Sequence, residues 1–560
     1  MTSSGNELVA QTLTSLGLRD FFYIMGGPMV DLERLLVESG VRAVDVRHEQ
    51  GAAMMAHAYS RVTGRVGVAM GCSGPGTLNL HMGVATAWAD GAPIVIFGGS
   101  SPGFQTGMGT FQEVDQVACF APITKWATRI TDPARVSDTV QEAFQRARSG
   151  RPGPVYVDLP ADMLYARLAE ADTSRANERR TFQLSRDVVI SPNTLHRHRA
   201  GADPERVAAA AQLLAAAERP VIVSGTGVFW SEAWTELREL VDATGIPFYA
   251  TPQGRGVIEE DHPLALIAAR STAFREADVV LVVGTRINHM IGFGRPPRFH
   301  ADARFVQIDI EAEGLGHNHP VEVGLLGDAK IVLSQLTDEA RPLFAGRETS
   351  AWVGHLSEVH ARKAAEHEVL ASSDAVPIHP LRLAKEVRDA IGRDTILVVD
   401  GHEILNFSRQ TIPSYLPGHR LNSGPFGTMG VGVPFAVGAK VAAPDKQVVL
   451  VEGDGSFGMN GMEIDTAVRH DVAITCVLSN NGGWTSQRPG PVRVGTILGH
   501  TRYEKIAEAL GAHAEFVDQP DQIRPALDRA MASGRPAVVN VITDPTARAE
   551  TARYSVHESV

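Results

Sequence analysis

Short apolar runs alternate with amphipathic stretches along most of the chain. In the first third the runs are AVDVR, VGVAM, PIVIFGG and PVYVDLP, and between them lie EQGAAMMAHAYSRVTG and DPARVSDTVQEAFQRARSG. Short apolar runs are typical of strands buried on both faces, and amphipathic stretches that end at glycine are typical of helices. The alternation predicts a parallel sheet that is covered by helices.

Two polar connections, residues 167–202 and 345–377, divide this alternation into three α/β segments. The second segment contains the runs PVIVSG, DVVLVVG and RFVQIDI, and the third contains TILVVDG, QVVLVEGDG, ITCVLSNNGG and PAVVNVITD. The first and third segments are similar in size, which indicates a paired architecture. We therefore predict three doubly wound parallel-sheet domains and a tail, with these boundaries: 1–170, 195–345, 375–545 and 546–560.

The composition excludes several classes of protein. A chain of 560 residues, 44% of them hydrophobic, is too long for one core and suits about three domains. The net charge is -12 and no basic run stands out, so nucleic-acid binding is not expected. The chain has neither the signature of a signal peptide nor an apolar run of membrane-spanning length, so we expect a cytoplasmic protein. Its cysteines fit neither a zinc site nor a disulfide framework, and buried thiols are predicted for Cys72, Cys119 and Cys476.

The stretch EGDGSFGMN, residues 452–460, places one carboxylate between two glycines directly after an apolar strand. Asp454 therefore lies at the carboxyl end of that strand, where open α/β sheets bind ligands. Asn481, within NNGG, follows the next predicted strand 27 positions later (481 − 454 = 27). Two adjacent strand ends would bring these side chains together. Carboxylate, amide and main-chain oxygens suit Mg²⁺, and the surrounding glycines leave room for a diphosphate.

GDGSF followed by NNGG resembles the signature of thiamine-diphosphate (ThDP) enzymes. The resemblance implies that Mg²⁺ is held by the Asp454 carboxylate, the Asn481 side chain and the main-chain carbonyl of Gly483. It also implies that the main chain from Gly453 through Gly455 to Ser456 lies beside the diphosphate.

The same resemblance assigns residues in other segments. Glu49, in VDVRHEQGAAMMAHAYSR, matches the catalytic glutamate that hydrogen-bonds N1′ of the pyrimidine and promotes its imino tautomer. A glutamate that is favoured at a helix N-terminus by the helix dipole is the structural alternative. In GPFGTMGVGVPF, Met429 matches the residue over which the cofactor bends, and the Gly427 carbonyl matches the acceptor for the 4′-amine. The stretch VDGHE provides residues that match contacts to the diphosphate, namely Gly401, His402 and Glu403. A catalytic base is the alternative role for His402.

The resemblance covers about residues 1–545, in the order pyrimidine-binding, central and diphosphate-binding domain. In this family the residues that match Glu49 and Asp454 reach one cofactor from different subunits. A homodimer or homotetramer with active sites at the subunit interface is therefore implied. ADP is a further candidate ligand of the central domain.

The central segment favours a coenzyme A (CoA) thioester as substrate. HPLALIAARSTAFREADVVLVVGTRINHMIGFGRPPRF resembles 2-hydroxyacyl-CoA lyases and oxalyl-CoA decarboxylases, which contain a matching AARS and a GxRxN. The Gly-Met-His-Gly stretch that acetolactate synthases associate with FAD is not found, although their FQE segment is shared. Arginine binds phosphate in a bidentate manner, so the candidate ligands of the CoA phosphates are Arg255, Arg270, Arg298 and Arg409.

Two loops are candidates for substrate contact. YIMGGP, with Gly26 and Gly27, lines the mouth of the pyrimidine site in relatives, and its small residues leave space for a branched carbon. Pyruvate decarboxylases carry an acidic residue in place of Gly27, which disfavours their reaction. The second loop contains Phe111 and Gln112.

The loop after NNGG, GGWTSQRPGPVRVG, contributes two more candidates. Trp484 is expected to wall off an apolar pocket. Gln487 is expected to hydrogen-bond the substrate hydroxyl, although an amide cannot take its proton. The predicted catalytic residues are thus Glu49, Gln112 and Gln487.

We expect a ThDP-dependent lyase that cleaves a short, branched or unbranched 2-hydroxyacyl-CoA to formyl-CoA and an aldehyde or ketone. The reverse acyloin condensation should also run. The alternatives are an oxalyl-CoA decarboxylase, an acetolactate-synthase-like enzyme acting on 2-keto acids, and a non-catalytic ThDP-binding regulator. The tail at 546–560 is either a lid over the thioester or a disordered end.

Overall fold

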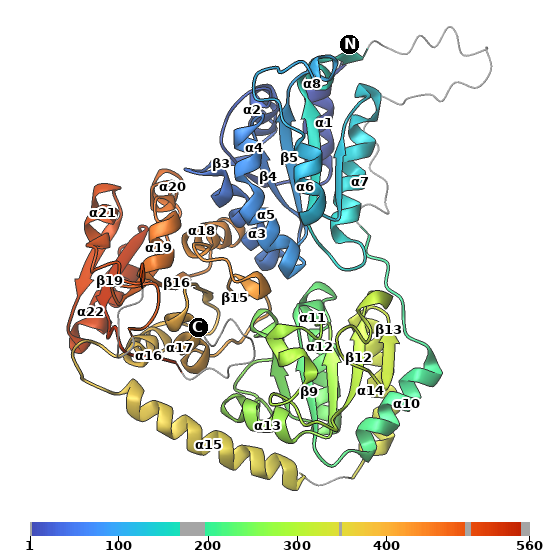
Figure 1. The fold of residues 1–560 in the computed structure, drawn as a ribbon, viewed down its shortest axis with the longest axis vertical. Coiled ribbons are helices and arrows are strands. Elements are labelled where there is room, and N and C mark those ends of the chain that lie inside the picture. Colours follow the sequence, from blue (N-terminus) through green and yellow to red (C-terminus); the bar gives the residue numbers. More distant parts are fainter. Residues whose placement is uncertain (1–2, 169–195, 347–349, 488–493, 550–560) are drawn as a thin grey trace. The chain divides into compact units, whose positions relative to one another are not determined.

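Three parallel β-sheets form the framework of the protein (Figure 1). The computed structural model describes residues 3–168, 196–346, 350–487 and 494–549. All strand pairs within these three sheets are parallel, which confirms the predicted fold class. The chain divides into two compact units, one of residues 1–197 with 437–442 and one of residues 198–436 with 443–560. The second and third sheets therefore belong to one unit.

The first sheet has the strand order β3-β2-β4-β5-β7-β6. Its strands are β2 (Asp20–Tyr23), β3 (Arg42–Asp45), β4 (Gly67–Gly71), β5 (Ile94–Ser100), β6 (Trp126–Arg129) and β7 (Val155–Pro160). Its helices are α1 (Gly5–Ser15), α2 (Val30–Glu38), α3 (Glu49–Thr63), α4 (Pro75–Asn79), α5 (His81–Asp90), α6 (Gln116–Phe120), α7 (Val136–Arg148) and α8 (Ala161–Tyr165). A short antiparallel pair, β1 (Ser3–Ser4) and β8 (Arg167–Leu168), joins the two ends of this region. Most of the predicted connection at 167–202 lies outside the described residues.

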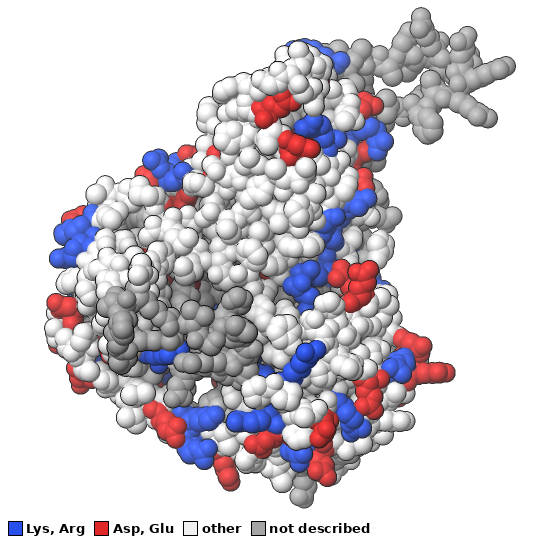
Figure 2. Space-filling view, viewed as in Figure 1, with Lys and Arg blue, Asp and Glu red and all other residues white. Residues whose placement is uncertain are grey.

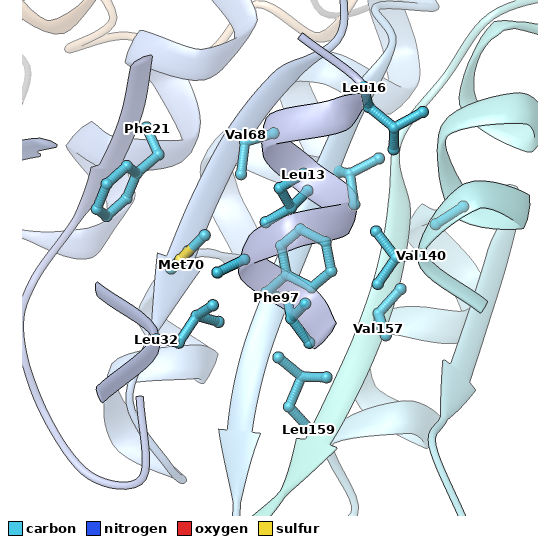
Figure 3. Close-up of a cluster of buried hydrophobic side chains, with 14 of the residues drawn as sticks. Leu13, Leu16, Phe21, Leu32, Val68, Met70, Phe97, Val140, Val157 and Leu159 are labelled. Atoms are coloured by element: carbon cyan, nitrogen blue, oxygen red, sulfur yellow. The ribbon is translucent and has the colours of Figure 1, made fainter. Parts of the chain in front are cut away.

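Helices cover both faces of the first sheet because its strands are apolar on both sides. On one face, Leu13 of α1 and Val140 of α7 belong to the same buried cluster as Phe97 of β5 (Figure 3). Phe21 of β2 is part of this cluster, whereas the next residue, Phe22, points to the opposite face. There its ring centroid lies 6.3 Å from that of Tyr59 in α3. This is the doubly wound arrangement that the sequence predicts.

The central sheet has the order β10-β9-β11-β12-β13. Its strands are β9 (Pro220–Ser224), β10 (Phe248–Ala250), β11 (Val279–Val283), β12 (Arg304–Asp309) and β13 (Val323–Leu326). The surrounding helices are α10 (Pro204–Ala216), α11 (Thr226–Trp230), α12 (Trp234–Thr244), α13 (Arg270–Glu276) and α14 (Ala329–Phe344).

The second predicted polar connection is largely a helix, α15 (Ala351–Ala371). Its first turns bury a narrow apolar stripe against the core of the central sheet, formed by Trp352, Val353, Leu356 and Val359. Its far end is charged, and Glu368 pairs with Arg388 of α16 (Pro380–Ala390) at 3.3 Å. A helix with so narrow an apolar stripe reads as a polar linker in the sequence, which explains why the pattern did not reveal it.

The third sheet has the order β15-β14-β16-β17-β19-β18. Its strands are β14 (Ile396–Val399), β15 (Arg420–Leu421), β16 (Val448–Gly453), β17 (Thr475–Asn480), β18 (His513–Val517) and β19 (Ala537–Ile542). Its helices are α16 (Pro380–Ala390), α17 (Glu403–Thr411), α18 (Gly432–Ala442), α19 (Asp454–Asn460), α20 (Glu463–Arg469), α21 (Tyr503–Ala509) and α22 (Ile523–Ala532). Numbered in chain order, both six-stranded sheets run 2-1-3-4-6-5, which is the paired architecture that the segment sizes indicate.

The surface carries charges of both signs, and the burial of the cysteines differs from the prediction. Lysine and arginine lie among aspartate and glutamate on the face shown in Figure 2, and no basic region dominates that face. No helix in the described part of the chain combines the length and the apolarity needed to cross a membrane. Cys72, Cys119 and Cys476 are all free thiols, but only Cys476 is buried; Cys72 and Cys119 are half-buried, so the prediction of three buried thiols is wrong for these two.

Candidate functional site

The carboxyl ends of β14, β16 and β17 border a cavity in the third domain, here called the strand-end cavity. Since these strands are neighbours in a parallel sheet, the loops that follow them meet at one edge. Most residues that the resemblance assigns to the cofactor line this cavity: Gly401, His402, Glu403, Met429, Gly453, Asp454, Gly455, Ser456, Asn481 and Gly483, together with Trp484. Residues of four separate motifs are thus brought together.

Asp454 is the central acid of the strand-end cavity. Its side chain is buried, and neither Oδ2 of Asp454 nor the hydroxyl of Ser456 has a hydrogen-bond partner among the described residues. Burial raises the pKa of Asp454 to about 6, although the main-chain N–H groups of Gly455, Asn481 and Gly483 act in the opposite direction. A buried, partly unsatisfied carboxylate at this place is the arrangement expected of a ligand site.

The two asparagines of NNGG have different roles. The Asn480 side chain is fully buried and ties the sheet together, because its Nδ2 donates to Asn540 Oδ1 of β19 at 3.1 Å. The Asn481 side chain reaches the strand-end cavity, and its Oδ1 accepts a hydrogen bond from the Gly483 N–H at 3.1 Å. Gly482, which lies between Asn481 and Gly483, has a φ of 70°, so the turn favours glycine there.

Asp400, which follows β14, anchors the segment that carries Met429. Its carboxylate accepts hydrogen bonds from the N–H groups of Gly401 at 2.6 Å and Gly432 at 2.9 Å. Asn460 holds the same segment through a 2.6 Å bond to the Gly430 carbonyl. Met429 is thereby fixed at the border of the strand-end cavity.

A much larger cavity, here called the arginine cavity, opens from the strand-end cavity. Its volume is about 1010 Å³, and it extends between the central and third sheets. The two cavities share five lining residues: Gly401, His402, Glu403, Met429 and Thr485. Gly427 and the four predicted arginines line the arginine cavity.

The four arginines differ in how they are satisfied. Arg255 forms a buried ion pair with Glu260, and its guanidinium also donates to the carbonyls of Arg409 and Ile412, each at 3.1 Å. This guanidinium is therefore committed to protein partners. Arg409, by contrast, has no ion pair or side-chain hydrogen bond to any described residue. Burial and the neighbouring charges of Arg255 and Arg298 lower the pKa of Arg409 to about 10, so it stays protonated at neutral pH.

Arg270 and Arg298 approach the same aromatic ring. The guanidinium carbon of each lies 5.2 Å from the centroid of Phe274, a favourable cation–π distance. Tyr249 packs edge-on against Phe274, and its buried hydroxyl has no hydrogen-bond partner among the described residues. The arginine cavity thus offers cations and an unsatisfied hydroxyl to a ligand.

The loop that follows NNGG covers part of the strand-end cavity. Trp484 lies against Gly455, where a Cβ would come within 2.7 Å of Cε3 of the indole. The Gln487 side chain is exposed, and its main-chain N–H donates to the Pro545 carbonyl at 2.6 Å. The predicted tail begins at residue 546; its residues from 550 onward lie outside the described residues.

Glu49 is the first residue of α3, in the first domain, and its side chain is 7% exposed. Its Oε2 accepts a hydrogen bond from Asn79 Nδ2 at 2.9 Å. A Cβ at Gly76 would lie 3.1 Å from Oε1 of Glu49 and 2.4 Å from the sulfur of Cys72. The carboxylate is therefore held in a tight pocket rather than pointing to solvent as an ordinary helix-capping acid does.

The predicted substrate loops of the first domain lie around Cys72. A Cβ at Gly26 would come within 2.5 Å of Cβ of Cys72, whereas one at Gly27 would meet nothing within 4 Å. Gln112 has a φ of 60° and packs against Gly74, two residues after Cys72. Phe111 is 83% exposed.

Sequence reasoning missed several residues that shape these sites. Gln116 holds Gly74, against which Gln112 packs, because it accepts from the Gly74 N–H at 2.7 Å and donates to Asp158 at 2.7 Å. Asn79 was missed because it carries no motif of its own. The strand-end cavity is also lined by Pro380, Ile404, Ser479, Thr485, Asp544 and Ala547.

Comparison with known proteins identifies three matching family models. The N-terminal TPP binding domain of thiamine pyrophosphate enzymes matches residues 3–119, the central domain residues 207–336, and the C-terminal TPP binding domain residues 405–541. A 2-hydroxyacyl-CoA lyase of Arabidopsis thaliana is 35% identical over 98% of this chain and 97% of its own. An acetolactate synthase large subunit of Mycobacterium tuberculosis is 37% identical over 97% and 96%. An oxalyl-CoA decarboxylase of Escherichia coli is 32% identical over 98% and 96%.

Proposed function

Because the chain belongs to the thiamine pyrophosphate enzyme family, we propose that it is a ThDP-dependent carbon–carbon lyase. Its substrate is a short, branched or unbranched 2-hydroxyacyl-CoA, which is cleaved to formyl-CoA and an aldehyde or ketone. The reverse acyloin condensation runs on the same site. The observation that carries this proposal is the continuity of the strand-end cavity with a large cavity lined by Arg409, which pairs with no acid among the described residues.

The residues present fit the cofactor. The Asp454 carboxylate, the Asn481 amide and the Gly483 carbonyl provide hard oxygen ligands for Mg²⁺, and a cation would satisfy the unpartnered Oδ2 of Asp454. The unpartnered Ser456 hydroxyl and the N-terminus of α19 suit phosphate oxygens. Nowhere in the described ranges do three or more His, Cys, Asp or Glu side chains form a group that suits a metal, so the proposed ligand set relies on one acid together with amide and main-chain oxygens.

When bound, ThDP supplies a nucleophilic carbon and an electron sink for cleavage of the bond between C1 and C2. Glu49 holds a proton at N1′ of the pyrimidine, and Met429 and the Gly427 carbonyl orient the rings. Gln112 and Gln487 hydrogen-bond the substrate's polar groups. As amides they cannot take the hydroxyl proton, so the base is a different group.

Arg270, Arg298 and Arg409 hold the phosphates of the CoA portion. Arg409 favours this assignment because an unpaired cation beside two like charges gains most from a bound anion. Arg255, whose guanidinium already binds Glu260, acts by supporting the cavity wall. The space for the acyl group is limited by Trp484 and by the small residues Gly26 and Gly27.

Glu49 and Asp454 belong to different compact units of the chain. We place the active site at the interface of a homodimer or homotetramer, in which one subunit provides Glu49 and another Asp454. Light scattering of the purified protein tests this assembly, and a monomer that is fully active contradicts it. The cytoplasmic location and an additional ADP ligand stay predictions.

Acetolactate synthesis is the second candidate, because a relative with that name is 37% identical. Pyruvate has no phosphate groups, so this reaction gives no role to the cations of the arginine cavity. Oxalyl-CoA decarboxylation does use a CoA ester, and the substrate assay separates it.

The test is a product assay with ThDP and Mg²⁺ present. A short 2-hydroxy-2-methylacyl-CoA should yield formyl-CoA and a ketone. Oxalyl-CoA and pyruvate are the matched comparison substrates. Carbon dioxide from oxalyl-CoA, or acetolactate from pyruvate, at a higher kcat/KM than formyl-CoA formation would overturn the proposal in favour of those reactions.

A further inference from the structure

Glu403 lies where the two cavities meet. It is the first residue of α17, directly beyond the carboxyl end of β14, and it lines both cavities. Its side chain is 9% exposed. A carboxylate at this place is unexpected beside a diphosphate, because both groups are anionic and both only accept hydrogen bonds.

Both carboxylate oxygens of Glu403 are used by other parts of the chain. Oε1 accepts a hydrogen bond from the Ser486 hydroxyl at 2.9 Å, and Oε2 accepts one from the Ala549 N–H at 3.0 Å. The imidazole Nδ1 of His402 lies 3.6 Å from Oε1. Burial raises the pKa of Glu403, but His402, the Ala549 N–H and Ser486 outweigh it and hold the pKa below its ordinary value.

The segments that Glu403 joins are also tied to each other. The Gln487 N–H donates to the Pro545 carbonyl at 2.6 Å. The first residue of the segment 543–549 is bound to the sheet, because the Thr543 N–H donates to the Asn480 carbonyl at 3.0 Å. Ala549 is 4% exposed and belongs to the buried cluster of the third domain. Glu403, the 484–487 loop and residues 543–549 are thus each hydrogen-bonded to the other two, at the junction of the two cavities.

We propose that Glu403 is a positioning residue that clamps the 484–487 loop to residues 543–549 at the junction of the two cavities, and is not a ligand of the diphosphate. The clamp places Trp484, which precedes Ser486, against the strand-end cavity. The clamp also holds Arg548 in the wall of the arginine cavity, because Arg548 directly precedes Ala549. The clamp does not depend on the proposed lyase function, but its effect on substrate binding rests on it.

Amide hydrogen exchange on the cofactor-free protein tests the clamp directly. Glu403→Gln keeps the size of the side chain but lacks the second acceptor oxygen and the charge. We expect the amides of 484–487 and 543–549 to exchange about tenfold faster or more, the range for loss of a charged hydrogen bond. Ser486→Ala removes one bond only and should accelerate exchange in 484–487 more than at Ala549. Glu386→Gln, which removes a carboxylate paired with Arg382 at 2.9 Å in α16, is the matched control and should change neither segment.

Ligand binding separates the clamp from a diphosphate contact. With Mg²⁺ present, the Glu403→Gln protein should bind ThDP within about threefold of the parent protein. Its KM for the CoA thioester should rise about tenfold, with a smaller change in kcat. Unchanged exchange in both segments overturns the clamp, and so does a large loss of ThDP affinity without faster exchange. Because the exchange is measured without substrate, failure of the lyase assay alone leaves this result intact.

Discussion

Trp484 lies so close to Gly455 that a Cβ at position 455 would come within 2.7 Å of Cε3 and 3.0 Å of Cζ3 of the indole ring. Gly455 is the second glycine of the GDG motif, and Trp484 follows NNGG. The two motifs are thus packed directly on each other as well as lining one cavity. The absence of a side chain at 455 is what admits the indole.

Gly455→Ala should therefore displace Trp484 and weaken ThDP binding. Overpacking of this kind costs about 1–3 kcal/mol, so we expect about a tenfold rise in the Kd for ThDP with Mg²⁺. The double variant Gly455→Ala, Trp484→Ala removes the clash and should recover part of the affinity. Fluorescence titration of the four proteins in this cycle measures the coupling. Additive effects of the two substitutions would show that the contact does not matter for binding.

Glu49→Gln should abolish catalysis while ThDP still binds. The amide cannot hold the N1′ proton as the carboxylate does, and loss of such a group lowers kcat by about 10²–10⁴. Steady-state kinetics and a parallel ThDP titration check this. Asn79→Ala removes the 2.9 Å hydrogen bond to Glu49 and should give a smaller loss, since the acid itself remains. Substantial activity in Glu49→Gln would contradict the assigned role.

Arg409→Met should raise the KM for the CoA thioester about 10- to 100-fold, because a charge-assisted hydrogen bond to phosphate is worth about 1.5–3 kcal/mol. ThDP affinity and kcat should change little. Arg393→Gln is the matched control, since that guanidinium pairs with Asp261 at the surface, outside the arginine cavity. Equal KM values for Arg409→Met and the control would remove Arg409 from the substrate site.

Glu33 of α2 should make stability depend on pH. It is 6% exposed, and burial raises its pKa to about 8 from an ordinary 4.5. The folded state therefore binds more protons than the unfolded state between pH 4.5 and 8, so stability falls as pH rises through this window. After a discount for residual solvent screening, we expect about 2 kcal/mol.

Urea unfolding at a series of pH values measures the Glu33 effect. Glu33→Gln cannot titrate, so its free energy of unfolding should lack this decline, whatever its absolute stability. Glu38→Gln, a change of an exposed acid in the same helix, should keep the parent slope. The same slope in the parent and Glu33→Gln proteins would mean that Glu33 is not protonated in the fold.

The sequence was sufficient to predict three parallel sheets, because strands that are buried on both faces appear as continuous apolar runs. It missed β2, β6, β10, β13, β15 and β18, which are only two to five residues long. It also failed for α15, because only a short stripe of that helix packs on a core.

Motifs located Asp454 and Asn481, but they could not say which neighbouring polar residues serve the fold. Glu452, two positions before Asp454, is fully buried and faces α18, where a Cβ at Gly432 would lie 2.4 Å from its Oε2. Likewise Asn480 binds within the sheet and only Asn481 reaches the cavity. Such divisions depend on which face of a strand a side chain occupies, and short motifs do not carry that information.

The assignment of Arg255 shows a second limit. From sequence, the four arginines are equivalent cations, and only the fold brings Glu260 to one of them. The same holds for Glu403, whose partners Ser486 and Ala549 are 83 and 146 positions away. Contacts between residues so far apart in the sequence depend on the topology of the fold, and a single sequence does not reveal that topology.

The identical strand order of the two six-stranded sheets has a consequence for how this enzyme can change. The same strand order occurs twice, with the buried acid Glu49 after β3 in the first sheet and Asp454 and Asn481 after β16 and β17 in the third. The loops of either six-stranded domain can therefore change without a change in the order of its strands. New specificities should arise by variation at the sheet rims, while the buried strands of both copies stay the same.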